Sequence, residues 1–218
     1  MTANQLSSHY PCLYHMAEPD AWPSICRHGL LSTEAVLDLL SPAHNLREQL
    51  LTQRRAQIVE LRDPRYGTFR LRDQKPLNDT LLAAALTDMS VGDWYRLLNG
   101  KVFFWPTRER VLTLLTARAY RYREHAVITV DTAALLDRHV GRITLSRINS
   151  GATLYRPVPR GSNTFRVLAD WPSDTLPRAG RLRRPVAEVA ADHSLPDIAN
   201  FATSVTVMRG QEVLRTLL

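Results

Sequence analysis

The chain has 218 residues, of which 44% are hydrophobic and 22% are charged. A chain of this length and composition can bury a hydrophobic core of its own, and we expect a single domain over residues 1–218. The longest apolar runs, such as Leu81 to Leu86, are far too short to span a bilayer, and the N-terminus lacks a basic segment followed by an apolar one. We therefore expect a soluble, cytoplasmic protein with no membrane partner.

Arginine supplies nearly all of the positive charge, which amounts to a formal net charge of +7 and an isoelectric point of about 9.9. Lys75 and Lys101 are the only lysines. Guanidinium groups suit the planar recognition of phosphates and bases, although a high-GC genome would also replace lysine with arginine throughout a sequence. The excess charge favours a polyanionic partner, which we expect to be a nucleic acid.

Cysteine usage argues against a metal centre. Cys12 and Cys26 are the only cysteines, and neither belongs to a Cys-x-x-Cys pair or lies near a second cluster of metal ligands. We therefore expect no zinc site, no other bound metal and no disulfide framework. Both cysteines are predicted to be buried, reduced thiols.

The first half of the chain is predicted to be mostly helical. Residues 1–12 are predicted to form a loose N-terminal arm. Gly29 suits the C-terminal end of one helix and Ser32 the N-cap of the next. The polar stretch 62–78, which contains Pro and Gly, is predicted to be a mobile loop. The expected elements are a strand at 13–16 and helices at 22–28, 33–40, 45–61, 80–89 and 91–98.

The second half is predicted to contain most of the strands. Residues 102–105 form an apolar strand that Pro106 stops, and 126–130 has the composition of a buried strand. Helices are expected at 107–120 and 132–139. Beyond Ile143 the pattern is one of strands and turns. No internal repeat or domain linker is visible.

Several common catalytic signatures are missing from the sequence. It has no Gly-x-x-x-x-Gly-Lys phosphate loop, no Gly-x-Gly-x-x-Gly after a strand, no His-Glu-x-x-His and no Gly-x-Ser-x-Gly. The sequence therefore argues against a P-loop enzyme, a Rossmann dinucleotide-binding enzyme, a zinc peptidase and an α/β-hydrolase.

Three separated segments carry a resemblance to a known family. Residues 13–32 run from Leu-Tyr-His-Met through Trp-Pro-Ser-Ile to His-Gly-Leu-Leu-Ser. This stretch resembles the opening of the DarT-type ADP-ribosyltransferases, in which a strand ending in Tyr-His leads to a Pro-Ser-Ile helix. Val-Phe-Phe-Trp-Pro-Thr-Arg at 102–108 and Pro-Val-Ala-Glu-Val-Ala at 185–190 resemble the aromatic strand and the glutamate strand of the same family. The resemblance thus spans residues 13–190 in a consistent order.

The resemblance implies an α+β fold of the ADP-ribosyltransferase type, with two packed, mostly antiparallel sheets, surrounding helices and a central NAD⁺ cleft. It implies mono-ADP-ribosyl transfer from NAD⁺, as co-substrate, to a nucleobase in DNA or RNA, with release of nicotinamide. It also implies a toxin-like bacterial enzyme with an antitoxin or ADP-ribosylhydrolase partner. The loop at 62–78 would help to select the acceptor. An RNA 2′-phosphotransferase of related fold and a non-catalytic nucleic-acid-binding protein are the alternatives.

Glu188 is the expected catalytic carboxylate. Breaking the bond between nicotinamide and ribose passes through an oxocarbenium-like state, which a carboxylate beside the ribose stabilises; the carboxylate can instead take a proton from the incoming nucleophile. Glu188 lies among apolar residues of a predicted strand, where a purely structural sequence more often carries Thr or Val. The alternative is a solvated residue on the polar face of that strand.

The resemblance also implies which residues bind NAD⁺. His15 would hydrogen-bond to the ribose hydroxyls, and backbone groups at Met16 would hold the carboxamide. The alternative for a lone histidine is a hydrogen-bonded place in the core. Aromatic side chains would wall the nicotinamide, or would simply pack in the core. The expected set is Tyr14, His15, Met16, Ser24, Arg55, Phe104 and Trp105.

An arginine after the second helix of the family engages the NAD⁺ phosphates and helps catalysis. Arg54 and Arg55 lie at a comparable distance from His15, and Arg54 is preferred slightly for the catalytic role. A solvated helix face would explain both. The family often has Asn just before the Pro-containing turn, where this chain has Ala21, so that one polar contact to NAD⁺ is missing or is supplied elsewhere.

A donor-rich stretch at 146–153 has no obvious structural purpose. We expect its Asn149 and Ser150 to contact the acceptor substrate. The alternative is an ordinary polar turn between strands.

Overall fold

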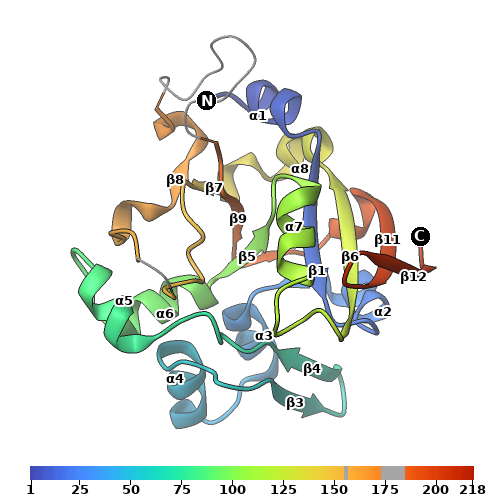
Figure 1. Ribbon diagram of the computed structural model, residues 1–218. Helices are drawn as coiled ribbons and strands as arrows, with labels where there is room; N and C mark the ends of the chain where they lie inside the picture. The colour runs from blue at the N-terminus through green and yellow to red at the C-terminus, as the bar shows by residue number, and fades with distance from the viewer. Residues whose placement is uncertain (155–156, 173–184) are drawn as a thin grey trace.

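Two four-stranded antiparallel sheets form the centre of the computed structural model, which describes residues 1–154, 157–172 and 185–218 (Figure 1). The first sheet has the order β1-β6-β11-β12, formed by Cys12–Ala17, Glu124–Asp131, Ala202–Arg209 and Glu212–Thr216. The second has the order β5-β9-β7-β8, formed by Lys101–Phe104, Glu188–Asp192, Ile143–Ser146 and Arg166–Val167. This confirms the predicted α+β class with antiparallel sheets.

The two sheets share one hydrophobic core. Leu13 and Ile128 of the first sheet and Phe104 and Val189 of the second all belong to it, and none of the four is exposed. The sheets also touch through their edge strands, because the Tyr14 amide donates to the Trp105 carbonyl at 2.9 Å and the Trp105 amide donates back at 2.8 Å. β1 and β5 therefore lie side by side where the sheets meet.

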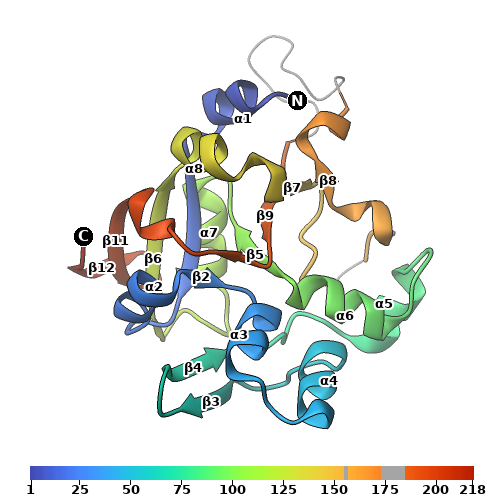
Figure 2. The same ribbon diagram turned by 180° about the vertical axis from the view of Figure 1, so that it is seen from behind.

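Helices and two short ladders surround this centre, as Figure 2 shows from behind. α1 and α8 lie together at one end, and α3 to α6 lie at the other with the β3–β4 hairpin. None of the helices in the described part of the chain is both long and apolar enough to cross a membrane. The helices are α1 Ala3–His9, α2 Trp22–His28, α3 Thr33–Leu40, α4 His44–Thr52, α5 Asp79–Ala85, α6 Val91–Asn99, α7 Arg108–Leu115 and α8 Thr132–His139. The remaining strands are β2 Leu30–Leu31, β3 Val59–Asp63, β4 Gly67–Leu71 and β10 Ser194–Leu195.

The predicted loose arm at residues 1–12 is wrong, because most of it is the helix α1. Thr2 and Gln5 form a reciprocal capping box at its N-terminus. Leu6 is fully buried in the main core, and Tyr10 beyond the helix is only 5% exposed. The Tyr10 hydroxyl also accepts a hydrogen bond from the Val186 amide at 3.2 Å. One cap and two apolar side chains at helical spacing thus anchor the segment.

The predicted mobile loop at 62–78 is also wrong in its first part, which belongs to the β3–β4 hairpin. The helix expected to reach residue 61 ends at Thr52, so that β3 begins at Val59. Apolar side chains on one face of the hairpin pack against α3 and α4, and Gly67 adopts a φ of +87° in the turn. The apolar residues of the hairpin are Val59, Leu61, Phe69 and Leu71.

Capping residues and glycine set the ends of the helices whose limits were predicted best. α2 and α8 have the expected limits, and Ser32 caps α3 through the Ala35 amide. Gly29 ends α2 with a φ of +80°, and a Cβ there would lie 2.4 Å from the Cα of Pro196, so only glycine fits. Helices without such signals stop early: α5 ends at Ala85 and α7 at Leu115.

The two cysteines are both free thiols, but they are less buried than expected. Cys12 is half-buried and Cys26 is exposed on α2. The prediction of buried thiols is therefore wrong, because Cys26 lies on the outer face of the amphipathic helix whose Ile25 faces the core.

Candidate functional site

A cleft of about 370 Å³ lies where β1 and β5 meet, and the β3–β4 hairpin forms one of its walls. Such a volume is in the range of small-molecule sites. Five of the predicted NAD⁺-binding residues line the cleft, namely His15, Met16, Ser24, Arg55 and Trp105. The structure thus brings together residues from β1, α2, the segment after α4 and the end of β5.

His15 offers the cleft a defined hydrogen-bond acceptor. Its Nδ1 lies 2.8 Å from the carbonyl oxygen of Phe103. Because a carbonyl oxygen only accepts, Nδ1 carries the hydrogen and Nε2 carries a lone pair in the neutral ring. Burial lowers the pKa of His15 to about 4, more than the Phe103 contact raises it. At neutral pH, Nε2 can therefore accept a hydrogen bond from a ligand hydroxyl.

Arg55 is the arginine of the pair that reaches the cleft. It is 9% exposed, and its Nη1 donates to the Leu50 carbonyl and to Asn99 Oδ1, both at 2.9 Å. Its Nε donates to the Arg72 carbonyl at 3.1 Å. Burial lowers the pKa of Arg55 to about 10, so the group stays charged at neutral pH. The acceptors of its hydrogen bonds are neutral, and the only opposing charge that acts on its pKa is that of nearby Asp73 among the described residues, so Arg55 can still attract an anion.

Arg54, in contrast, does not line the cleft. Its side chain is exposed and lies 3.7 Å from Asp79 at the start of α5. The sequence could not separate the two neighbours, because the contacts that bury Arg55 join it to residues distant in the sequence, such as Asn99. The slight preference for Arg54 as the catalytic arginine has no support in this arrangement.

Sequence reasoning missed a second arginine of the cleft, Arg72. Its guanidinium lies 5.0 Å from the centre of the Tyr120 ring, and the Tyr120 hydroxyl in turn donates to the buried Asp73 at 3.3 Å. A cation over an aromatic face is held in place without losing its net charge. Because Arg72 follows a strand that was expected to be a loop, no sequence signal marked it.

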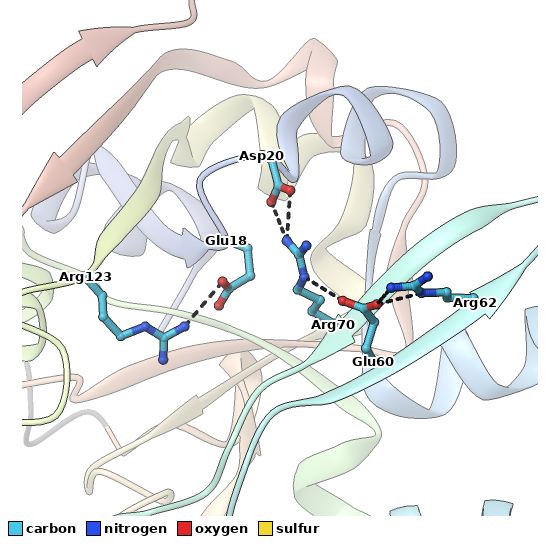
Figure 3. A network of polar contacts seen from close by, with 6 residues as sticks. All are labelled: Glu18, Asp20, Glu60, Arg62, Arg70 and Arg123. Carbon is cyan, nitrogen blue, oxygen red and sulfur yellow. Dashed lines mark hydrogen bonds and ion pairs between the residues drawn. The ribbon is translucent and has the colours of Figure 1, made fainter.

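Ion pairs fasten the rim of the cleft (Figure 3). Arg70 of β4 donates to both carboxylate oxygens of Asp20, at 2.9 and 2.8 Å, and also to Glu60 of β3 at 3.2 Å. Arg123 lies 3.5 Å from Glu18. The hairpin is therefore tied across the cleft to the turn that precedes α2.

The predicted aromatic wall is divided between the cleft and the core. Tyr14 and Trp105 pack with Met16 against α7. Met16 and Trp105 also line the cleft, whereas Tyr14 does not. Phe104 is fully buried in the main core, with its ring 5.7 Å from that of His15. Core packing, the alternative reading for aromatic residues, therefore describes Tyr14 and Phe104, whereas Trp105 lines the cleft.

Glu188 is buried at the start of β9, outside the cleft lining. It is 6% exposed, and the Ser150 amide donates to its Oε2 at 3.1 Å. Burial raises the pKa of Glu188 to about 7, against the opposing effect of hydrogen bonds from Ser150. The next residue, Val189, pairs with Phe104 of β5, and Glu188 itself pairs with Ser146 of β7. The alternative of a solvated strand residue is wrong.

The two predicted acceptor-binding residues differ in their surroundings. Ser150 is 1% exposed and covers Glu188, whereas Asn149 beside it is exposed. Arg160 holds this turn, because its Nη1 donates to the carbonyls of Ser150 and Ala152 at 3.0 and 3.1 Å. The turn therefore has a structural purpose that the sequence did not reveal.

Ala21 also lines the cleft, next to Ser24. It contributes no polar side-chain atom where the family often has Asn. The polar groups nearest along the chain are those of Asp20, which is paired with Arg70, and of Ser24.

A family model matches residues 11–202, which is most of the chain. The chain belongs to DUF7002. The description of DUF7002 is a family of unknown function, so membership assigns no activity. The part that matches DUF7002 begins one residue before β1 and ends at the start of β11, and so includes the cleft and Glu188. Searches of curated proteins and of solved structures find no match.

Proposed function

We propose that the chain is an NAD⁺-dependent mono-ADP-ribosyltransferase with an ADP-ribosyltransferase-like fold, and that its acceptor is a nucleobase in DNA or RNA. The observation that carries the proposal is the cleft at the β1–β5 junction, which His15, with Nε2 as its acceptor, and the charged Arg55 both line. A dinucleotide needs both kinds of group, because its riboses present hydroxyl donors and its pyrophosphate presents negative charge.

The residues of the cleft can be given separate roles toward NAD⁺. His15 accepts a hydrogen bond from a ribose hydroxyl, and Trp105 supplies a flat apolar surface for the nicotinamide. Arg55 and Arg72 bind the pyrophosphate, since the hydrogen bonds of the Arg55 guanidinium go to neutral acceptors and the Arg72 guanidinium lies over the Tyr120 ring. The Met16 backbone lies beside His15 in the lining and suits the carboxamide.

Transfer breaks the bond between ribose C1′ and the nicotinamide nitrogen, and nicotinamide leaves with the electron pair. A ring or amino nitrogen of the acceptor base then bonds to C1′ and gives up its proton. Glu188 serves this step in its ionised form, either by stabilising positive charge on the ribose or by taking the proton. Its carboxylate is covered by the Ser150 turn, so we expect that turn to move when both substrates bind.

The test uses NAD⁺ labelled in the adenylate, incubated with single-stranded DNA, single-stranded RNA and cell lysate. Free nicotinamide and label on the polynucleotide should rise together, and Glu188→Gln should abolish both. Glu212→Gln, which removes an exposed carboxylate of β12, is the matched control and should keep full activity. If nicotinamide never exceeds the background of Glu188→Ala, the proposal fails.

An RNA 2′-phosphotransferase is a second candidate, favoured by one observation. The basic residues of the cleft lining are Arg55, Arg70, Arg72 and Lys101, its carboxylates Glu18 and Asp20 are paired with Arg123 and Arg70, and Glu188 is not part of it. That chemistry relies on basic residues rather than on a glutamate. An RNA that carries an internal 2′-phosphate is the decisive substrate. Dephosphorylation that survives Glu188→Gln would support this candidate, and oligonucleotide binding with no NAD⁺ binding would favour a non-catalytic protein instead.

A further inference from the structure

A second cavity, of about 350 Å³, lies on the other side of β9 from the cleft. β7, the 157–161 segment, the turn before β8 and Trp171 form its walls. The two cavities share no lining residue. Nothing in the proposed NAD⁺ site therefore uses this cavity.

The lining of the second cavity is strongly basic. Arg147, Arg160 and Arg166 contribute three guanidinium groups, and Asp88 is the only carboxylate among the described residues of the lining. The Asp88 carboxylate is already engaged, because it accepts hydrogen bonds from the amide and the hydroxyl of Ser162. The cavity is thus suited to an anion.

Arg160 gives the cavity a rigid cationic group. It is 3% exposed, and its Nε donates to the Val158 carbonyl at 3.1 Å while Nη1 holds the Ser150 turn. Gly161 follows it, and a Cβ there would lie 1.9 Å from Asp88 Oδ1 and 2.6 Å from Thr87 Oγ1. The backbone therefore packs closely against the Thr87–Asp88 segment, which fixes the position of Arg160.

An aromatic ring, that of Trp171, lies beside the arginines of the second cavity. Trp171 is 3% exposed and lines the cavity, with the Arg147 guanidinium 5.3 Å from its ring centre. Arg166 lies at the open side, where its exposed side chain donates to the Asn163 carbonyl at 3.3 Å. Guanidinium groups around an aromatic ring are the combination with which proteins bind nucleotides and their phosphates.

Glu188 lies between the two cavities. On one side β9 pairs with β5, whose Phe103 lines the cleft, and on the other side it pairs with β7, whose Ser146 lines the second cavity. Ser150 links the second cavity to the carboxylate, since its carbonyl accepts from Arg160 and its amide donates to Glu188. A transferase has to bring both of its substrates to the same reacting group in a defined orientation.

We propose that the second cavity binds a phosphate group of the acceptor polynucleotide and so places the acceptor base beside Glu188. This inference rests on the proposed transferase function. The phosphates of NAD⁺ share the same chemistry, but the cleft has Arg55 and Arg72 for them, whereas Arg160 of the second cavity holds the Ser150 turn that covers Glu188. The acceptor is therefore held by its backbone, independently of its base.

The experiment compares Arg166→Ala with Arg121→Ala. Both variants remove one exposed arginine, and Arg121, whose guanidinium lies 4.6 Å from the centre of the Tyr122 ring, is not part of the lining of this cavity. Binding of a single-stranded oligonucleotide is measured at several salt concentrations, together with NAD⁺ hydrolysis in the absence of an acceptor. For Arg166→Ala we expect roughly tenfold weaker oligonucleotide binding and a salt slope reduced by about 0.7 for single strands. Hydrolysis of NAD⁺ should keep the wild-type rate.

An oligomer without bases and a second variant of Arg166 test whether the cavity recognises phosphate. An abasic deoxyribose-phosphate oligomer should bind the wild-type protein and lose affinity in Arg166→Ala, and Arg166→Lys should restore part of the binding. The inference is overturned if Arg121→Ala weakens binding equally, or if Arg166→Ala raises the KM for NAD⁺ instead. Should the wild-type protein fail to hydrolyse NAD⁺ while Arg166 still governs oligonucleotide binding, the transferase proposal fails and the phosphate site stands.

Discussion

At the scale of single residues, the protonation state of Glu188 links burial to activity. Burial raises the pKa of its carboxyl to about 7, so the carboxyl changes its protonation state close to neutral pH. Because the proposed chemistry needs the carboxylate, transfer should become about tenfold slower for each pH unit below 7 and should level off above it. The measurement is the pH dependence of kcat/KM, with Glu188→Gln as the variant that should be slow at every pH. A wild-type rate that increases on acidification would contradict this role.

The neighbours Arg54 and Arg55 provide a second comparison at this scale. Arg55→Ala removes a buried donor at 2.9 Å from both the Leu50 carbonyl and Asn99 Oδ1, and leaves them the longer contacts from Asn99 Nδ2 and Gln74 Nε2. We therefore expect a loss of about 3 kcal/mol in the free energy of unfolding and weaker NAD⁺ binding. Arg54→Ala should change stability by less than about 0.5 kcal/mol, because that side chain is exposed. Urea unfolding and NAD⁺ titration of both variants decide the matter. Equal losses of stability and of NAD⁺ affinity in the two variants would contradict a separate role for the buried Arg55.

At the scale of elements, the β3–β4 hairpin is expected to control access to the cleft. Arg70 ties β4 to Asp20 across the rim, whereas Arg65 pairs with Asp63 inside the hairpin turn. Arg70→Ala should lower global stability by less than about 1 kcal/mol, since exposed ion pairs contribute little. It should nevertheless speed amide hydrogen exchange in the hairpin and weaken NAD⁺ binding. Arg65→Ala is the matched control. Equal rates of amide hydrogen exchange in the two variants would contradict the idea that the Arg70–Asp20 ion pair holds the hairpin in place.

Elements with local signals could be predicted from the sequence, and those that depend on distant contacts could not. α2 has Pro23 near its start and Gly29 at its end, so its limits were predictable. The hairpin has alternating apolar residues, but the Arg, Asp and Pro between them resemble a loop until α3 and α4 cover one face. The same limit applies to the site: a strand at Glu188 could be expected, but its cover by Ser150 joins residues 38 positions apart.

At the scale of the whole molecule, buried titratable groups make stability depend on pH in two opposing ways. Burial lowers the pKa values of His15 and His125 to about 4 from an ordinary value of 6.5, so both rings must take up a proton on unfolding in moderate acid. Their contribution to stability is present above pH 6.5 and is lost as the pH falls toward 4. The raised pKa of Glu188 acts in the opposite sense, because its contribution is present below about 4.5 and is lost as the pH rises through 7.

Because two histidines act in one sense and one glutamate in the other, we expect the protein to lose stability as the pH falls from 6.5 to 4.5. The measurement is the midpoint of urea unfolding at each pH. His125→Phe keeps a ring in this fully buried position and removes one proton acceptor, so the loss should become shallower. Glu188→Gln removes the opposing group, so the loss should become steeper. His44→Ala, at an exposed position, should leave the slope unchanged. Opposite signs for the two buried variants cannot arise from a general weakening of the core, which would lower the midpoint at every pH alike.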